Sequence, residues 1–545
     1  MFGPWPARIA AAALLLFGSA GCSKPAVPAP AQVLSAAVTL APPLPSPPKP
    51  VAGNPEAPIP PQCYTRTAGV ANPCWTCHTT KNGHNLKGDW QLQEVYAFSE
   101  AGLENHWKTL FEDPRPGIAA ISDREMLRYL REDNLSPWQA TRPAGAPAFD
   151  LKPGIDAEGF LRDGSGWRAL RYQPFPGTFW PTNGASDDIY LRLPERFRQD
   201  AAGRPSRAFY RLNLALLEAA MTQPDTVSDK ALQRAVEPID ERLLGVDLDG
   251  NGQLGTATRI VGLPARYAGA ASAEPVQRWS APLGSEYVHT VRYLDAEAPG
   301  WLSPRVKEFR YAIKWANPDA NGRAAAYKES EQEKLTGRLP YFAAGQHGGL
   351  RNPLGWEYRG WIEDARGALR AQDYEETLSC MGCHGGIGIT VDSSFGLARK
   401  VPGAAGWAQQ SLVGLKDIPQ AGHAEPEVLT YFRRVGGGDE FRGNAEILKR
   451  FFPKGKLDEA SVRRAATGGD ADLQHLLLPS AERAMALNKA YWLLVRQQRY
   501  KEGRMPVLAP AHNVLQSVQN GDTELRAKHL VYSDGRLWLD WPENP

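Results

Sequence analysis

The sequence predicts a mainly α-helical chain in which two helical regions are separated by a segment of mixed α/β structure. Apolar residues recur at helical spacing over 99–132 and again over 459–500. Between these regions, residues 309–315 alternate apolar and polar side chains, as strands do, among Gly- and Pro-rich turns. A pentapeptide of the form Cys-x-x-Cys-His precedes each helical region.

Residues 1–22 have the pattern of a secretory signal peptide. Arg8 precedes an apolar run over 9–17, which is too short to span a bilayer, and small residues at 19–21 precede Cys22. Because the segment ends on a cysteine, it resembles the lipobox of bacterial lipoproteins, which implies that Cys22 carries the lipid. Ordinary cleavage without lipidation is the alternative. We expect an exported, periplasmic protein that acyl chains tether to the membrane.

Residues 23–62 predict a linker. The segment is rich in Pro and Ala and carries almost no charge, so we expect an extended spacer that holds the folded part away from the membrane. The whole chain has 545 residues and a net charge of only +2. This balance argues against nucleic acid as a partner.

The two pentapeptides are the strongest chemical signal in the chain. Thiols at this spacing add to the two vinyl groups of a haem, while the imidazole that follows reaches the iron. Zinc is the main alternative, but it needs further Cys or His pairs at ligand spacing, and the sequence has none. We therefore expect two covalently bound haem c groups. The residues that would bind them are Cys74, Cys77, His78, Cys380, Cys383 and His384.

The first folded region, 63–146, predicts two helices after its pentapeptide. They cover 99–112 and 122–132, and the second opens with a capping box between Ser122 and Glu125. A haem motif followed by helices in about eighty residues resembles a small class I cytochrome c domain. With a second such region at 374–545, the resemblance implies mainly α cytochrome c-like haem domains with a mixed α/β insertion between them, over 147–373.

The insertion and the second region have their own signals. In the insertion we expect helices over 208–221 and from Ser228, and neighbouring strands over 287–294 and 309–315. In the second region we expect helices over 459–467 and 480–500. The sequence Asp534-Gly535 within 530–539 predicts a hairpin, because this dipeptide accepts the positive φ of a tight turn.

The sixth ligand of each iron decides whether it can only pass electrons or can also bind a substrate. For the first haem the candidates are His106, Met126, His84 and Cys63. Cys63 would act as a thiolate, and an inert buried thiol is its alternative. For the second haem the pool is His423, His475, Met485, Met505 and His512, and His347 could serve either haem.

Asp247, Asp249 and Asn251 occupy positions 1, 3 and 5 of an EF-hand-like loop, with Gly252 at position 6. Position 12, which is usually acidic, is Thr258. The loop predicts a partial calcium site, and its alternative is a turn without metal.

The sequence thus favours a periplasmic dihaem c-type cytochrome that transfers electrons between redox proteins or small-molecule donors and acceptors. The alternative is a dihaem oxidoreductase with one open or thiolate-ligated haem. Dihaem peroxidases resemble the chain in having two motifs, and dihaem thiosulfate dehydrogenases in using a cysteine ligand. However, His384 follows His78 by 306 positions, a wider separation than we expect of either family.

Overall fold

The computed structural model describes residues 52–80, 83–84, 98–177, 180–222, 228, 230–336, 339, 341–420, 423–437, 441, 443–466, 472–518 and 530–539. The predicted signal peptide, Cys22 and most of the predicted linker lie outside these residues. The chain from Pro50 onward forms one compact unit.

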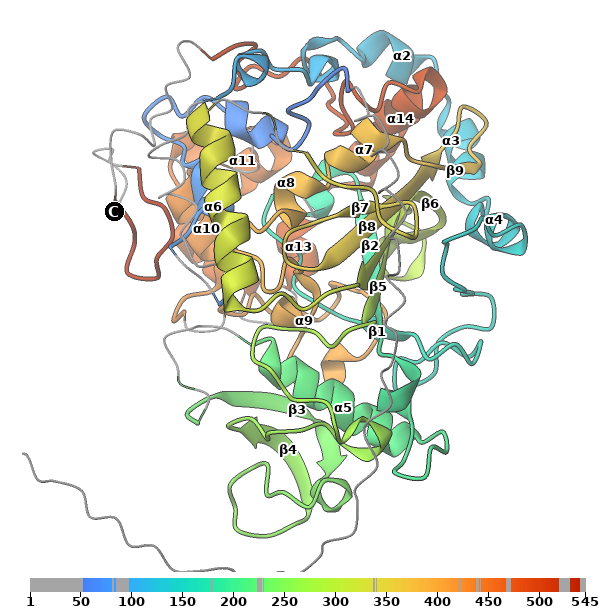
Figure 1. The fold of residues 1–545 in the computed structure, drawn as a ribbon. Coiled ribbons are helices and arrows are strands. Elements are labelled where there is room, and N and C mark those ends of the chain that lie inside the picture. The colour runs from blue at the N-terminus through green and yellow to red at the C-terminus, as the bar shows by residue number, and fades with distance from the viewer. Residues whose placement is uncertain are drawn as a thin grey trace, which may run out of the picture. The chain divides into compact units, whose positions relative to one another are not determined.

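A seven-stranded antiparallel sheet lies at the centre of this unit (Figure 1). The strand order is β1-β2-β5-β6-β8-β7, and β9 pairs with the other part of β8. The strands are β1 (Arg168–Leu170), β2 (Ser186–Arg192), β5 (Glu286–Leu294), β6 (Leu302–Lys314), β7 (Leu350–Arg351), β8 (Trp356–Glu363) and β9 (Leu369–Ala371). The predicted neighbouring strands at 287–294 and 309–315 are confirmed as β5 and β6, which pair with each other.

The two faces of the sheet have different surroundings, because successive side chains of a strand point to opposite faces. One face carries Tyr190, Val288, Phe309 and Trp361, which pack in a hydrophobic cluster with residues of the 135–170 segment. The opposite face includes His289, which stands opposite Ile189 of β2 and Arg310 of β6 in the register. This second face forms a wall of the site described below.

A smaller hairpin stands apart from the main sheet. Strands β3 (Gln233–Asp240) and β4 (Thr256–Val261) pair with each other, and α5 (Arg207–Ala220) packs against them (Figure 1). Helix α5 confirms the helix predicted over 208–221. The helix predicted from Ser228 is wrong: pairing of Gln233 with Val261 extends the backbone there, so a tertiary contact overrides the local pattern.

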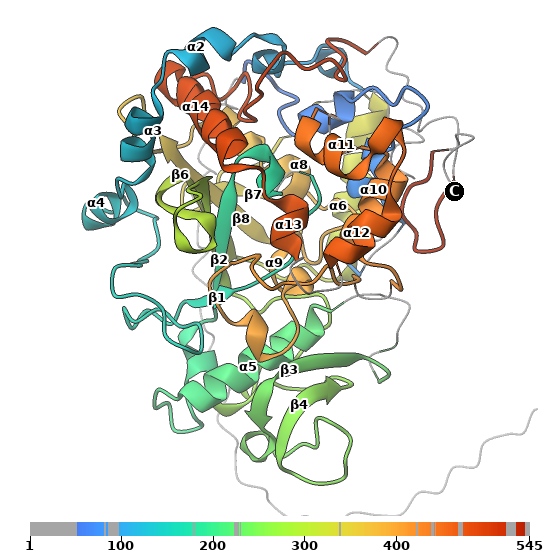
Figure 2. The same cartoon turned by 180° about the vertical axis from the view of Figure 1, so that it is seen from behind.

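Helices α10 to α13 gather beside the sheet, as seen from behind in Figure 2. Their apolar faces share one core cluster that includes Val428, Phe432, Ile447 and Leu473. The helices of the first region and of the rest of the chain are α2 (Arg115–Ala119), α3 (Asp123–Leu130), α4 (Leu135–Ala140), α6 (Ala320–Thr336), α7 (Tyr374–Leu378), α8 (Met381–His384), α9 (Gly396–Arg399), α10 (Glu427–Val435), α11 (Ala445–Phe451), α12 (Glu459–Ala466), α13 (Leu473–Leu477) and α14 (Ala481–Gln497).

Most of the other predicted elements are confirmed. Ser122 caps α3 and Ser480 caps α14, each accepting a backbone N–H three residues on. Helix α12 covers most of 459–467, and the predicted hairpin turns at Gly535, whose φ is +82°. The helix predicted over 99–112 is wrong, since the structure has only the 3₁₀ turns Ala101–Leu103 and Lys108–Phe111 there.

The backbone around residue 105 explains the missing helix. The N–H of Asn105 donates to the carbonyl of Gln516, and its side chain donates to that of Leu515. Glu104 and Ser517 form an isolated antiparallel β-bridge, the backbone pairing that neighbouring strands make. Backbone groups that would close helical turns are therefore used by a distant part of the chain.

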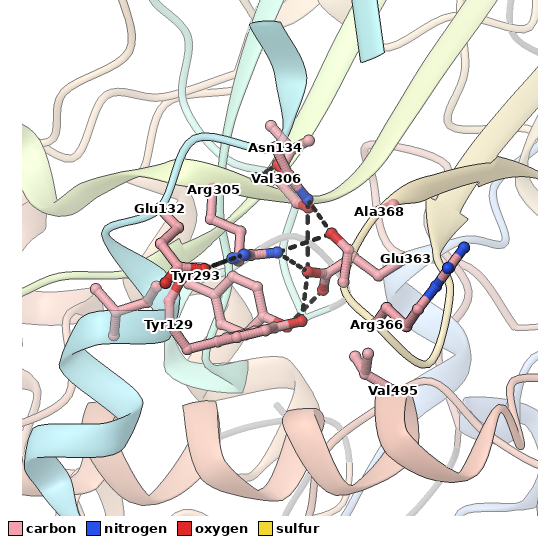
Figure 3. A network of polar contacts seen from close by, with 12 residues as sticks. Tyr129, Glu132, Asn134, Tyr293, Arg305, Val306, Glu363, Arg366, Ala368 and Val495 are labelled. Atoms are coloured by element: carbon pink, nitrogen blue, oxygen red, sulfur yellow. Dashed lines mark hydrogen bonds and ion pairs between the residues drawn. The ribbon is translucent and has the colours of Figure 1, made fainter. Parts of the chain in front are cut away.

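A buried polar network joins the first region to the sheet (Figure 3). Glu363 at the end of β8 accepts hydrogen bonds from the hydroxyls of Tyr129 in α3 (2.7 Å) and Tyr293 in β5 (2.6 Å). Arg305 in β6 pairs with the same carboxylate at 2.9 Å and donates to the carbonyl of Tyr129 at 2.6 Å. Tyr129 also stacks on Trp492 of α14, with ring centroids 4.4 Å apart.

The expected fold class is therefore wrong. The described residues form a mixed α/β unit around a large antiparallel sheet, not mainly α cytochrome c-like domains with an α/β insertion. The helices of the first region pack against the sheet and α14 through the network above, and not around a centre of their own. The boundaries 63–146, 147–373 and 374–545 stay predictions.

Candidate functional site

The cysteines and the histidine of each Cys-x-x-Cys-His pentapeptide line a cavity, and part of the second pentapeptide borders both cavities. Cys74, Cys77 and His78 line a first cavity of about 1470 Å³. Cys380, Cys383 and His384 line a second cavity of about 280 Å³. The two cavities adjoin, because both have the same three residues in their walls. These residues are Pro60, Gln62 and Cys383.

The two pentapeptides share one local geometry. The N–H of the histidine donates to the carbonyl of the first cysteine, at 2.9 Å from His78 to Cys74 and 3.0 Å from His384 to Cys380. Each pentapeptide therefore makes one helical turn. Residues three and four positions apart lie on the same face of such a turn, so the second cysteine and the histidine are on the side of the first cysteine.

Residues near the C-terminus hold the first pentapeptide in place. Arg536 is almost completely buried and donates to the carbonyls of Trp75 and Thr76, each at 3.0 Å. The carbonyl of His78 accepts the N–H of Leu537 at 3.1 Å. Burial lowers the pKa of Arg536 to about 10, so its guanidinium is charged at neutral pH. The predicted C-terminal hairpin thus serves as a clamp on the first motif.

The second pentapeptide follows a short capped helix. Asp373 and Glu376 form a reciprocal capping box at the start of α7, and Cys380 continues from its end. Gly382 allows a close approach of the chain, because a Cβ there would lie 2.0 Å from the carbonyl oxygen of Pro58. Asn352 donates to the carbonyl of His384 at 2.7 Å.

The imidazole of His384 has a fixed orientation. Its Nδ1 lies 2.8 Å from the carbonyl oxygen of Ser393, so Nδ1 carries the proton and Nε2 is the nitrogen left for a metal. The hydroxyl of Tyr358 donates to the same carbonyl at 2.8 Å, and the Tyr358 ring lies against the imidazole. Burial, Arg310 and His289 together lower the pKa of His384 to about 4, which keeps the ring neutral at pH 7.

The Ser393 carbonyl belongs to a stretch of backbone with an uncommon conformation. Asp392 and Ser393 both have left-handed φ angles, of +50° and +54°. Such conformations are costly for residues other than glycine and persist where the surroundings enforce them. Here Asp392 forms an ion pair with Lys314 at 2.5 Å and accepts the N–H of Ala281 at 2.9 Å.

Charged side chains of the sheet also line the second cavity. Glu308 accepts hydrogen bonds from Arg310 at 2.9 Å and from Gln372 at 3.1 Å. Burial raises the pKa of Glu308, but Arg310 and Arg504 outweigh burial and bring this pKa down to about 2. Burial lowers the pKa of Lys307, on the same wall, to about 7.

Both sites fit a covalently attached haem. Each offers two thiols and an imidazole from one turn, on the wall of a cavity. In the second site, burial raises the pKa of Cys380 and raises that of Cys383 to about 11, so both are neutral thiols at pH 7. Guanidinium groups are suitable partners for haem propionates, and Arg310 and Arg504 supply two on this wall.

The zinc alternative finds no support in the described part of the chain. A structural zinc ion needs four converging ligands. Within the described residues, the one group of His, Cys, Asp or Glu atoms that converge within 4.8 Å is formed by Glu241, Asp247 and Asp249. Neither pentapeptide takes part in it.

The structure separates the candidates for the sixth ligand of the first haem. Cys63 lines the same cavity as His78. Met126 is completely buried in another core cluster, together with Tyr129. His106 lies 2.9 Å from the carbonyl of Ala101, and the ring of His84 lies against that of Trp279. These three do not line the first cavity as the described residues form it.

The pool for the second haem divides in the same way. Met505 lines the second cavity, and its sulfur accepts a hydrogen bond from Gln62 at 3.3 Å. His512 lines the first cavity instead of the second. The remaining members of the pool lie elsewhere. His423 contacts Asp534, His475 contacts Phe451, His347 contacts Glu357, and Met485 packs beside the cluster of Tyr491.

The predicted calcium loop gains a residue that the sequence pattern missed. Carboxylate oxygens of Asp247 and Asp249 lie within 4.8 Å of one from Glu241, which precedes the loop. Glu241 accepts the N–H groups of Leu248 (2.7 Å) and Asp249 (3.1 Å) and so holds the loop. The side chain of Asn251 accepts the N–H of Gln253. Calcium binding stays a prediction.

Comparisons with known proteins define the chain as a bacterial lipoprotein. A lipoprotein family model matches residues 49–467, a span that contains both pentapeptides. An uncharacterized lipoprotein of Aquifex aeolicus (strain VF5) is 33% identical over 518 residues, which cover 83% of this chain and 86% of that protein. The chain therefore belongs to this lipoprotein family.

Neither a solved structure nor a membrane-spanning helix is found for the described part of the chain. No solved structure matches the chain. Among the described helices, none combines the length and the apolar character that crossing a bilayer requires. Family membership supports export and lipid anchoring, as the predicted lipobox at Cys22 implies.

Proposed function

We propose that this lipoprotein is a dihaem c-type cytochrome that passes electrons between redox partners in the periplasm. The observation that carries the proposal is the pair of adjoining cavities, each lined by the two cysteines and the histidine of one Cys-x-x-Cys-His pentapeptide. Cys74 and Cys77 would attach one haem, with His78 as ligand. Cys380 and Cys383 would attach the other, with His384 as ligand.

Haem, when bound, supplies a one-electron couple at each site. The residues of the chain orient the ligands and set the surroundings of that couple. The shared wall formed by Pro60, Gln62 and Cys383 supports a short path between the two sites, as a relay requires. The small net charge does not favour nucleic acid as a partner.

A second candidate function is favoured by the first cavity alone. This cavity is several times larger than the second and has Cys63 on its wall with His78. A thiolate ligand or an open position there would suit an oxidoreductase that acts on peroxide or a sulfur compound. In that case the second haem would supply or remove the electrons.

The proposal is tested on the mature full-length protein purified from a host that attaches haem c. Mass spectrometry and a pyridine haemochrome assay should find two haems per chain, and a redox titration should resolve two one-electron steps. A protein with no attached haem would refute the proposal. A high-spin haem that changes its spectrum with peroxide or sulfite would favour the second candidate function, an oxidoreductase, over the electron carrier.

A further inference from the structure

His289 is a second imidazole on the wall of the cavity that contains His384. It lies near the middle of β5, where Tyr287 and Val291 point to the same face of the sheet and line the same cavity. The side chain is 18% exposed. The ligand candidates that the sequence predicts include no residue of β5.

The ring of His289 is held as metal-binding imidazoles are held. Its Nε2 lies 2.8 Å from a carboxylate oxygen of Asp187 in β2, and the hydroxyl of Tyr172 donates to the other oxygen of Asp187. A histidine that binds a metal commonly donates its second ring N–H to a carboxylate or a carbonyl, which fixes the ring and increases the basicity of the ligating nitrogen. His384 has the matching arrangement with the carbonyl of Ser393.

The two imidazoles line the same cavity. Tyr358, whose ring centroid lies 4.4 Å from that of His384, is in its wall together with His289. The register of β5 and β6 places His289 opposite Arg310, and both residues line the cavity with Cys380 and Cys383. His289 therefore lies on the wall of the cavity that the two thiols of the second pentapeptide also line.

We propose that His289 is the second axial ligand of the haem attached at Cys380 and Cys383, opposite His384. In the rotamer shown, ligation would use Nδ1 of His289, since Asp187 binds Nε2, and imidazole binds metals through either nitrogen. The inference rests on the proposed haem attachment. It specifies that the second haem is saturated and acts as an electron carrier, so any chemistry on a substrate belongs to the first site.

Met505 is the competing ligand on the same wall, and it provides a matched control. Its sulfur already accepts a hydrogen bond from Gln62, whereas the carboxylate on His289 strengthens ligation. The test uses full-length holoprotein and compares His289→Gly with Met505→Leu. Electron paramagnetic resonance of the oxidised protein and carbon monoxide binding by the reduced protein measure ligation without any enzyme assay.

We expect His289→Gly to retain two haems per chain, to lose one low-spin haem and to bind one more equivalent of carbon monoxide than the parent. Added imidazole should restore the low-spin signal, which shows that the variant is folded. Met505→Leu should have the spectrum of the parent.

Three outcomes overturn the inference. They are an unchanged spectrum in His289→Gly, a low-spin signal lost in Met505→Leu, and a second haem that is already high-spin in the parent protein. Should His289→Gly fail to accumulate, Asp187→Asn replaces it. We expect this variant to keep both low-spin haems and to raise the potential of one of them, and an unchanged potential would count against the role of His289. A chain that carries no haem refutes the proposed function itself, so the two failures are distinct.

Discussion

The two Cys-x-x-Cys-His turns share one hydrogen bond, from the histidine N–H to the carbonyl of the first cysteine, but they have very different supports. The second turn faces strands of the central sheet, which bring His289, Arg310 and Tyr358 to the wall of its cavity. The first turn instead packs on helix α10 through the buried ring of Trp75, and Arg536 from the C-terminal hairpin donates to its carbonyls. The sheet positions many side chains of the second cavity at once, whereas the first turn is held through one buried ring and a few long-range hydrogen bonds. We therefore expect damage to spread from the second site and to stay local at the first.

Loss of the buried carboxylate of Glu363, at the end of β8, should have the largest effect on the free energy of unfolding. Glu363→Ala leaves Arg305 buried without its partner, so the free energy of unfolding should fall by about 3–5 kcal/mol. The control is Glu132→Ala, because Glu132 is the exposed partner of Arg305 at 3.1 Å, and its loss should cost less than about 1 kcal/mol. Urea titrations followed by circular dichroism measure both values. Equal losses would show that the buried network does not support the sheet.

The same carboxylate should make stability depend on pH. Burial raises the pKa of Glu363 from 4.5 in the unfolded chain to about 7, despite Arg305, Tyr293 and Tyr129. The folded state therefore retains a proton that the unfolded state has lost between these values, and stability should fall as the pH rises from about 4.5 to 7. The loss corresponds to about 3 kcal/mol. Glu363→Gln should flatten this part of the profile of stability against pH, and an unchanged slope would assign it to other groups.

Removal of the clamp should affect only the first turn. Arg536→Met deletes two hydrogen bonds from a charged donor to the carbonyls of Trp75 and Thr76, a loss of about 2–3 kcal/mol. Hydrogen exchange at residues 74–78 should therefore become faster by at least tenfold, while residues 380–384 keep the parent rate. Arg433→Met is the control, because Arg433 pairs with Glu459 near the surface. Faster exchange at both turns would contradict a local effect.

The smallest effect is expected from the hydroxyl group of Tyr358. In Tyr358→Phe, the carbonyl of Ser393 accepts only the N–H of His384, so that hydrogen bond strengthens and the imidazole becomes a stronger donor to iron. We expect a lower potential for the second haem, an unchanged first potential and a stability loss below about 1.5 kcal/mol. Spectroelectrochemistry of parent and variant measures both potentials. A shift of the first potential would mean that the two sites are more strongly coupled than their supports suggest.

The sequence predicted those parts of the fold that local patterns determine. Strands β5 and β6, helices α5 and α14 and the turn at Gly535 follow from periodicity, capping and turn chemistry. The helix expected over 99–112 failed because Asn105 pairs with residues 515–516, more than 400 positions away. The cytochrome c-like fold class failed for a related reason. A haem motif indicates a cofactor, but nothing in it determines what the rest of the chain packs against.

The sequence predicted only those residues of the candidate site that lie within the two pentapeptides. Spacing alone identified the two thiols and the imidazole of each turn. His289 has no local signal, because its alternation with Tyr287 and Val291 predicts a strand but does not say which face meets the pentapeptide. Glu241 was missed for the same reason, since it precedes the Asp247 loop and approaches it only in the fold.

The clamp has a consequence for the order in which the protein matures. Arg536 follows Thr76 by 460 positions, so a chain that is exported from its N-terminus delivers the first turn long before the side chain that locks it. Under the proposed haem attachment, Cys74 and Cys77 would stay accessible to an attachment enzyme until the last residues cross the membrane. A chain that ends before Arg536 should therefore keep its first turn in this immature state.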